Sequence, residues 1–330
     1  MERAADAVPT INGRPVPLVS SADLLTQVYQ EFLATIQREI RGYALLHGAS
    51  LVGPDGRVTL ISAPGGHGKT TLTLALAARG WGVLSDDYSP LELRTGLIHP
   101  YPRTAAVAPQ GDAGMPDAFR TLSDQPGRPH LFGKALIDFG EALGEQAVVK
   151  EPRPLGRVVL VAADLDRADP LGVPPPERMT IGAPLPAAER LEARLVAVPG
   201  VRVVGRVEGP DLASWALDVD YGLGTAAALS EVLDDPAIRF IERDRGERPD
   251  FSRRPEARPI RRHEAALLLG RELLNRRGGD RALAGRPGGL VGLIFDLAGG
   301  LASASCWLLR PGPLDQTVEL IAGLDAEGAR

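Results

Sequence analysis

The sequence predicts an α/β fold in which a mixed central sheet is flanked by helices. Apolar runs of strand length, such as the one at 157–163, alternate along the chain with segments of helical periodicity. The stretch from Thr59 to Leu93 holds a strand, a Gly-rich turn, a helix and a second strand in immediate succession. The chain has 330 residues, 44% of them apolar, which is enough for one large α/β domain or two ordinary ones.

The composition excludes several classes of protein. The net charge of −5 argues against a nucleic-acid-binding protein, which needs a dominant basic surface. The single cysteine, Cys306, allows no intrachain disulfide and no Cys-based zinc cluster, and we expect it to be a buried apolar side chain. The first residues, "MERAADAVPT", do not resemble a signal peptide, and the most apolar stretch, 288–309, contains Asp296. We therefore expect a cytoplasmic protein that does not bind membranes.

The N-terminal segment, residues 1–43, is predicted to be separate from a main domain that spans residues 44–330. Its first part is Pro-rich and irregular, or forms a short strand pair around "INGRP". Ser21 has the character of a helix N-cap, and the apolar residues that follow it recur at helical spacing up to Ile40. This pattern predicts an amphipathic helix before the main domain.

The main domain is predicted to begin with a buried strand, "YALLHGASLVG", bent at His47-Gly48. A "PDG" turn leads into the strand "RVTLIS", and a helix from Thr70 to Arg79 ends at Gly80. The strand "WGVLS" follows, with Asp86 and Asp87 at its carboxyl end, and then a hairpin over "PLELRTGLIHPYPR".

The remaining elements are predicted less finely, with an α+β portion near 155–250. Residues 110–130 and 242–259 have the composition of loops, the second one charged and exposed. The other predicted elements are strands at 157–163, 201–207 and 290–295 with a further strand after the last, and helices at 186–198, 224–234, 257–279 and 312–324.

The Gly-rich turn "APGGHGKT", residues 63–70, matches the pattern of a phosphate-binding loop (P-loop). Gly65, Gly66 and Gly68 allow backbone conformations in which N–H groups converge on phosphates, and the next helix adds its positive N-terminal end. The pattern places Lys69 between the β- and γ-phosphates of a nucleotide and gives Mg²⁺ the Thr70 hydroxyl. The predicted nucleotide-binding set is Gly65, Gly66, His67, Gly68, Lys69, Thr70 and Thr71. The alternative is a glycine-rich turn with a solvated lysine, and for His67 an exposed side chain is favoured over a catalytic one.

Asp86 and Asp87 end the strand that follows the helix of this loop. Ligands of open α/β sheets bind at the carboxyl ends of strands, so at least one carboxylate is expected to face the γ-phosphate. One acid at such a point normally holds Mg²⁺, and a second can take the proton of an attacking hydroxyl. The alternative is that both acids cap a turn.

Together these pieces resemble the HPr kinase/phosphorylase family and the P-loop kinases related to ATP-dependent phosphoenolpyruvate carboxykinase. The shared order is His47-Gly48, the loop, "AARGWGVLS" and then Asp86-Asp87, and the resemblance covers residues 44–93. It implies an HPr kinase-like fold, ATP and Mg²⁺ as cofactors, and a homo-oligomer. It also implies that His47 orients one carboxylate while Asp86 and Asp87 divide metal binding and general-base work. Without the resemblance, His47 reads as a core histidine.

The chain also departs from that family. The acidic-Arg-Gly stretch of the family's second signature is not evident, so phosphorylase activity and the HPr substrate are not carried over. The segment "HPYPR", residues 99–103, resembles a branch found in biosynthetic clusters, whose members include kinases of a peptide serine. On this ground Arg103 is a candidate substrate ligand, and otherwise a solvated arginine.

A basic segment lies between 258 and 277. Acidic residues at 264 and 272 favour a solvated helix face with local ion pairs over a surface that attracts an acidic substrate. Its arginines are Arg258, Arg261, Arg262, Arg271, Arg276 and Arg277.

The sequence thus predicts an ATP- and Mg²⁺-dependent kinase that phosphorylates a hydroxyl, most simply a serine of a peptide or protein. One alternative is a kinase of a small metabolite such as free serine, and another is a non-catalytic nucleotide sensor. A GTPase or ATPase switch is disfavoured, because no Asn-Lys-x-Asp-like guanine-binding motif follows the loop.

Overall fold

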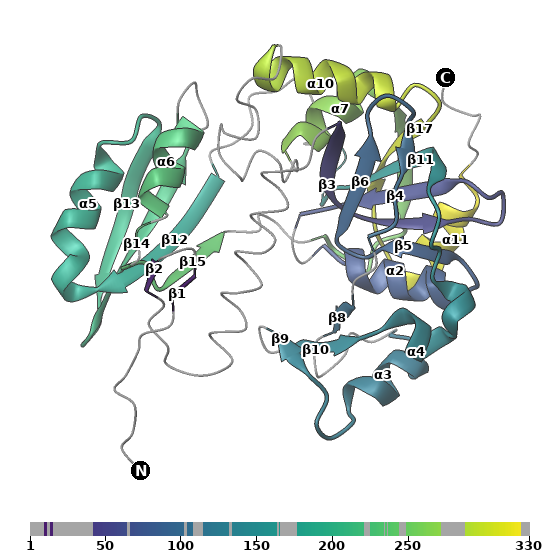
Figure 1. Ribbon diagram of the computed structural model, residues 1–330, viewed down its shortest axis with the longest axis horizontal. Coiled ribbons are helices and arrows are strands. Elements are labelled where there is room, and N and C mark those ends of the chain that lie inside the picture. The colour runs from purple at the N-terminus through teal and green to yellow at the C-terminus, as the bar shows by residue number, and fades with distance from the viewer. Residues whose placement is uncertain are drawn as a thin grey trace.

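The computed structural model describes most of the chain after residue 41 (Figure 1). The described residues are 10–11, 14–15, 42–64, 67–101, 104–107, 115–131, 134–163, 165, 177–220, 225–233, 235, 237–243, 249–271 and 288–324. The helix expected over residues 21–40 and the candidate residues Gly65, Gly66 and Arg103 lie outside them. The short strand pair expected near the N-terminus is present as β1 (Thr10–Ile11) and β2 (Arg14–Pro15).

The centre of the main part is a large mixed sheet, as predicted. Its strand order is β16-β17-β11-β4-β3-β6-β7, and β5 pairs with β3 off this path. β4, β11 and β17 are parallel, whereas β16, β3 and β6 each run antiparallel to a neighbour. The strands are β3 (Tyr43–Val52), β4 (Val58–Ser62), β5 (Gly82–Ser85), β6 (Tyr88–Glu92), β7 (Leu97–Ile98), β11 (Arg153–Val161), β16 (Glu256–Ile260) and β17 (Ser305–Arg310).

The long strand β3 gains a second neighbour at His47-Gly48, where a bend was predicted. Along one edge it pairs with β6 and then with β5, and along the other edge β4 begins at Gly48. Its first half, Tyr43 to His47, pairs with β6, and its second half, Gly48 to Val52, pairs with β4. Built on Gly48, a Cβ would lie 2.9 Å from the carbonyl oxygen of Ile61, so only glycine allows this approach of β3 to β4. This arrangement places His47 at the end of the sheet where β4 stops.

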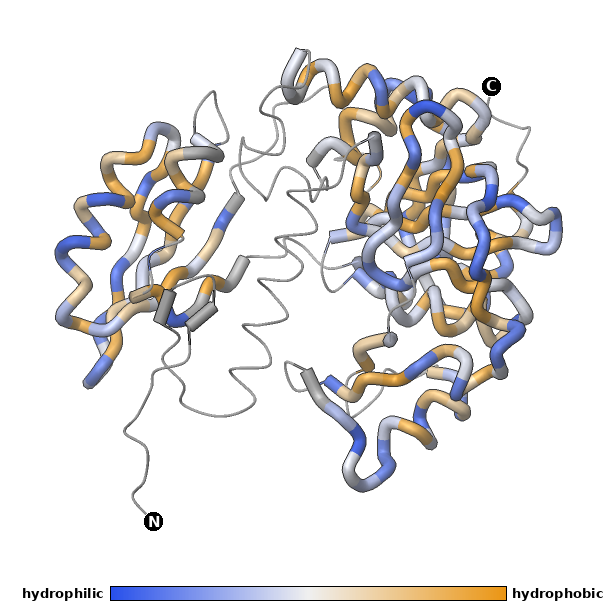
Figure 2. The backbone as a smooth tube through the Cα atoms, in the orientation of Figure 1, coloured by the Kyte–Doolittle hydropathy of each residue, from blue (hydrophilic) through white to orange (hydrophobic). Residues whose placement is uncertain are grey.

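Helices cover both faces of the sheet and bury its apolar side chains. α2 (Lys69–Ala78) and α11 (Leu314–Ala322) pack on one face, where Leu74 and Ile321 share a core with Ile61. α7 (Arg262–Arg271) and α10 (Gly289–Gly300) pack on the other, where Leu269 and Leu297 do the same with Leu60. Figure 2 shows the apolar strands between these two layers. This part is therefore a three-layer α/β structure.

A small three-stranded sheet borders the start of α2. It has the order β8-β10-β9, and two short helices, α3 and α4, share its core through Phe119 and Phe139. Its elements are β8 (Ala105–Val107), α3 (Asp117–Ser123), β9 (His130–Leu131), β10 (Lys134–Ile137), α4 (Phe139–Leu143) and the 3₁₀ turn η1 (Glu145–Ala147).

Residues 177–243 form a unit with a core of its own. The chain order is strand, helix, strand, strand, helix, strand, and the antiparallel sheet has the order β13-β14-β12-β15. This is the βαββαβ arrangement of ferredoxin-like units. Its elements are β12 (Glu177–Pro184), η2 (Leu185–Ala187), α5 (Ala188–Val196), β13 (Val201–Glu208), β14 (Leu212–Val219), α6 (Thr225–Leu233) and β15 (Phe240–Arg243).

Three predictions for the main part were wrong in type, and a fourth was wrong in where its helix begins. The expected strand 290–295 is the helix α10, whose inward residues Leu293, Leu297 and Leu301 are spaced by four. A short run that is apolar on all sides does not distinguish helix from strand by periodicity. The expected loops at 110–130 and 242–259 contain α3 and β16, and the expected helix over 257–279 begins only at 262 because β16 precedes it. Within the described residues, no helix is long and apolar enough to cross a membrane.

Candidate functional site

Three strands bring the predicted residues to one edge of the large sheet. β3 pairs with both β4 and β5, so that Gly48 lies opposite Ser62 and Ser50 lies opposite Ser85. β4 and β5 both run antiparallel to β3, and their carboxyl ends therefore meet at this edge. The Gly48 N–H donates to the Asp87 carbonyl oxygen at 3.1 Å, which fixes the turn that carries the two aspartates.

The helix α2 begins at this edge, and within the described residues no side chain caps its N-terminus. Gly68 has φ +83°, a left-handed conformation that favours glycine, and it lets the chain turn from the loop into the helix. No acid lies in its first turn either. The first N–H groups of the helix and its positive dipole end are therefore directed at the space beside the loop, as in sites that bind phosphate.

Lys69, the first residue of α2, forms a polar chain with His47 and Asp87. Its ammonium lies 3.0 Å from His47 Nε2 and 3.8 Å from Asp87 Oδ1, while His47 Nδ1 lies 3.2 Å from the same Asp87 oxygen. A lysine ammonium can only donate, so His47 Nε2 accepts and its Nδ1–H donates to Asp87. A neutral imidazole therefore joins the lysine to the carboxylate, and its ring orients Asp87.

Asp86 differs from Asp87 in its surroundings. Only 5% of Asp86 is exposed, and its Oδ1 makes no hydrogen bond within the part of the chain that the structure describes. Burial, with a smaller contribution from the negative charge of Asp87, raises the pKa of Asp86 to about 6. In contrast, the Asp87 side chain is 33% exposed and hydrogen-bonded to His47. The two adjacent carboxylates thus have different chemical capacities.

Lys134 is a further cation of the site that the sequence analysis missed. It is the first residue of β10, its side chain is exposed, and its positive charge acts with that of Lys69 to lower the pKa of Asp86. No motif includes it, because it lies far from the loop in sequence and reaches the site through the small sheet. The only sequence feature that could have indicated Lys134 is its position before the short apolar run "ALI".

The other predicted residues have mixed outcomes. Thr70 and Thr71 lie in the first turn of α2 and are half-buried. His67 is 3% exposed, so the expectation of an exposed side chain was wrong. The basic segment is not one solvated helix face, because Arg258 lies in β16 and donates to the Leu165 carbonyl oxygen. Cys306 is buried, as expected.

The donor set at this edge fits Mg²⁺ rather than a softer metal. Within the described residues no group of three or more His, Cys, Asp or Glu side chains could hold a metal by itself. Mg²⁺, however, usually binds through one or two carboxylates together with the phosphates of its substrate. The unpartnered Asp86 oxygen, the Asp87 carboxylate and the Thr70 hydroxyl supply this kind of incomplete oxygen site.

Comparison with solved structures gives several matches, among them one weak structural likeness. The structure of the HPr(Ser) kinase/phosphatase from Coxiella burnetii matches with 20% sequence identity and a TM-score of 0.25, over 41% of this chain and 75% of that chain. A likeness at this level carries no argument about activity. No family model matches the chain, and no curated protein matches it either.

Proposed function

We propose that this protein is an HPr kinase-like P-loop kinase that uses ATP and Mg²⁺ to phosphorylate a hydroxyl group. The observation that carries the proposal is the meeting of Lys69, His47 and Asp87 with the buried carboxylate of Asp86, whose Oδ1 has no partner within the described residues, at the start of α2. In this proposal residues 44–330 form the kinase domain, and the unit 177–243 is an insertion between β11 and β16 of its sheet.

The start of α2 and Lys69 hold the triphosphate. The backbone N–H groups of the first turn donate to phosphate oxygens, and the N–H groups of Lys69 that do not reach His47 donate to the β- and γ-oxygens. Asp86 and Thr70 hold Mg²⁺, because a buried carboxylate oxygen without a partner is costly until a cation satisfies it. When bound, Mg²⁺ neutralises charge on the phosphate oxygens.

Asp87 is the general base in this mechanism. Its carboxylate is partly exposed, so an acceptor hydroxyl can reach it from solvent, and the His47 N–H holds it in one orientation. The acceptor oxygen forms a bond to the γ-phosphorus while the bond from that phosphorus to the β–γ bridging oxygen breaks. The hydroxyl proton passes to Asp87, and ADP leaves with the bridging oxygen.

The acceptor we propose is a serine hydroxyl of a peptide or protein, following the resemblance of residues 99–103. A small metabolite such as free serine is the competing acceptor. Both use the same transfer chemistry and differ only in what lies around Asp87.

The test is phosphoryl transfer by purified full-length protein with Mg·ATP and a panel of serine-bearing acceptors. We expect one acceptor to gain the mass of one phosphate, and Lys69→Ala to reduce this turnover by at least about a thousandfold. The matched control is Lys150→Ala, which removes an exposed lysine that pairs only with Glu145 in the described part of the structure. Nucleotide binding without transfer to peptides, proteins or free serine, or equal activity of the two variants, would contradict the proposal.

A further inference from the structure

Phe251 is an exposed aromatic ring that lies directly over the start of α2. Its side chain is 43% exposed, although it is large and apolar. A Cβ built on Gly68 would lie 3.3 Å from Phe251 Cε1 and 3.5 Å from Cζ. One edge of the ring therefore contacts the N-cap residue of α2, and part of Phe251 remains open to solvent.

The segment that carries Phe251 is fixed in place on both sides of the ring. Asp250 Oδ1 accepts from the Ser252 N–H at 3.0 Å and from the Ser252 hydroxyl at 2.6 Å, which closes a tight turn around Phe251. The Arg253 carbonyl oxygen lies so close to Gly312 that a Cβ there would come within 2.0 Å of it. The ring is thus a supported surface rather than part of a loose loop.

The topology places Phe251 on the side of β4 opposite to the aspartates. Asp86, Asp87 and His47 come from β3 and β5, whereas Gly312 follows β17, which is separated from β4 by β11. Because β4, β11 and β17 are parallel, their carboxyl ends share the edge at which α2 begins. In the proposed binding mode the γ-phosphate faces the aspartates, and the ribose and base extend toward this opposite side.

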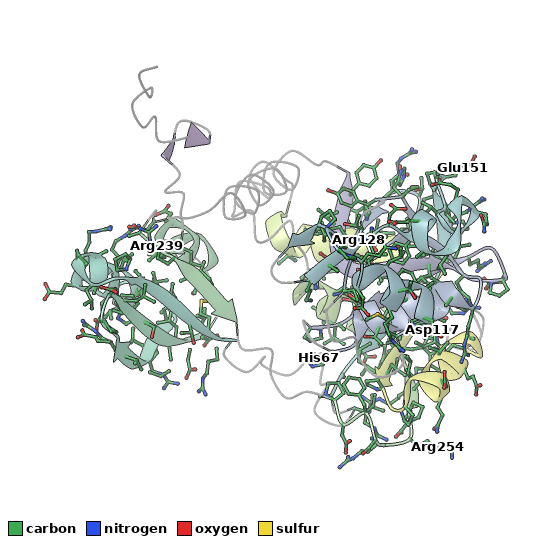
Figure 3. The ribbon with its side chains drawn as sticks, turned by 90° about the horizontal axis from the view of Figure 1, so that it is seen from below. His67, Asp117, Arg128, Glu151, Arg239 and Arg254 are labelled. Atoms are coloured by element: carbon green, nitrogen blue, oxygen red, sulfur yellow. The ribbon has the colours of Figure 1, made fainter. Side chains whose placement is uncertain are left out.

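An open pocket of about 410 Å³ lies along β16, the strand that follows this segment. Arg254, only three residues beyond Phe251, forms its rim beside α11 (Figure 3). Its other lining residues are Pro255, Glu256, Ala257, Arg310 and Leu320.

We propose that Phe251 is the stacking platform for the nucleobase of the bound nucleoside triphosphate. The inference rests on the proposed function, because it assumes that the triphosphate lies at the start of α2. An aromatic face attracts any base by stacking, and it contributes affinity without reading hydrogen-bond donors and acceptors. Phe251 therefore binds the base of ATP and that of GTP alike.

The experiment compares Mg·ATP with inorganic tripolyphosphate, which has the phosphates but no base. Calorimetric titration measures both dissociation constants for the full chain and for Phe251→Ala. We expect the substitution to weaken ATP and GTP binding at least about tenfold and to change tripolyphosphate binding less than about twofold. Phe251→Tyr keeps the ring and should stay within about twofold of the parent for every ligand.

The matched control is Phe295→Ala on α10, a ring that is 74% exposed and lies on the opposite helical layer. It should change neither constant. Equal weakening of ATP and tripolyphosphate by Phe251→Ala would mean that the ring only supports the loop, and no weakening would mean that the base lies elsewhere; either result overturns the inference alone. A parent protein that binds neither ligand, or a Lys69→Ala variant that binds both normally, would overturn the proposed function and the inference with it.

Discussion

The two sides of β4 are built differently, although both end at the same edge of the sheet. On one side, β3 and β5 are antiparallel neighbours and contribute His47, Asp86 and Asp87 within a short stretch of chain. On the other side, β11 and β17 run parallel to β4. Gly312 follows β17 and packs against the segment that carries Phe251. The charged groups suited to moving a proton and holding a metal thus lie on the first side, and the exposed aromatic surface suited to binding lies on the second.

This division implies that substitutions on the first side should act mainly on turnover, and those on the second mainly on affinity. The reason is chemical, because Asp87 would contact the reacting hydroxyl only, whereas an aromatic ring contacts the base equally in the ground state and the transition state. The comparison would be wrong if a substitution on the first side changed mainly the affinity, or one on the second side changed mainly the turnover.

The largest expected effect beyond that of Lys69 is from Asp87→Asn. The amide keeps the shape but cannot accept the hydroxyl proton, so we expect kcat to fall by about 10²–10⁴-fold. The dissociation constant for Mg·ATP should change only a few-fold. Steady-state kinetics and calorimetry on the same preparations measure the two effects.

Substitution of the neighbouring carboxylate, Asp86→Asn, tests whether Asp86 and Asp87 have different roles. If Asp86 holds Mg²⁺, this variant should lose the Mg²⁺ dependence of nucleotide binding as well as turnover. Asp117→Asn, an exposed acid on α3, is the control that should leave both unchanged. The assignment would be reversed if Asp87→Asn lost Mg²⁺-dependent binding and Asp86→Asn kept it.

A further prediction concerns the stability of the protein at different pH values in the absence of nucleotide and divalent cations. The pKa of Asp86 in the folded protein, about 6, lies above its ordinary value of 3.8, so folding favours the protonated form. The stability that this proton contributes is fully present below pH 3.8 and is lost as the pH rises through about 6. At pH 8 the protein carries the whole cost of a buried charge, at most roughly 3 kcal/mol for a shift of this size.

Asp86→Asn removes that cost, and we therefore expect it to raise Tm by several degrees at pH 8 and by much less at pH 4.5. Calorimetric scans of both proteins across this range, with a chelator present, make the measurement. Melting curves separated by the same interval at every pH would show that burial of a charge at Asp86 does not destabilise the fold.

The first side of β4 was predictable from sequence because its parts are neighbours along the chain. The loop, its helix and the two aspartates lie within the stretch 59–93, and strand, helix and strand must pack together over so short a distance. The sequence also marked His47-Gly48 as a special point of β3, but not the reason, which is that β4 joins the other edge of the strand there.

The second side was not predictable, because distant segments make it. Phe251 contacts Gly68 although more than 180 residues separate them in the sequence. The charged, Pro-containing stretch that includes β16 has no strand pattern of its own, and it is a strand because it pairs with β17. α10 was misread for a related reason: its exposed face carries Val291 and Phe295, so no polar stripe marked it as helical. Local sequence patterns do not predict contacts between segments that are far apart in the sequence.

The smallest expected effect is from Lys134→Met, and it tests whether the first side extends beyond β3 and β5. Lys134 belongs to the small sheet, and its exposed charge acts on the buried Asp86 only from a distance. We expect a loss of roughly three- to tenfold in turnover, since an exposed charge is screened by solvent and salt. The same screening should make the loss shrink when the ionic strength is raised.

The control is Lys134→Arg, which keeps the positive charge and should retain most of the activity at every salt concentration. Loss of activity in both variants, independent of salt, would mean that Lys134 acts through its shape or its packing at the start of β10. The acid side of β4 would then consist of His47, Asp86 and Asp87 alone, and the small sheet would contribute only apolar packing against α2.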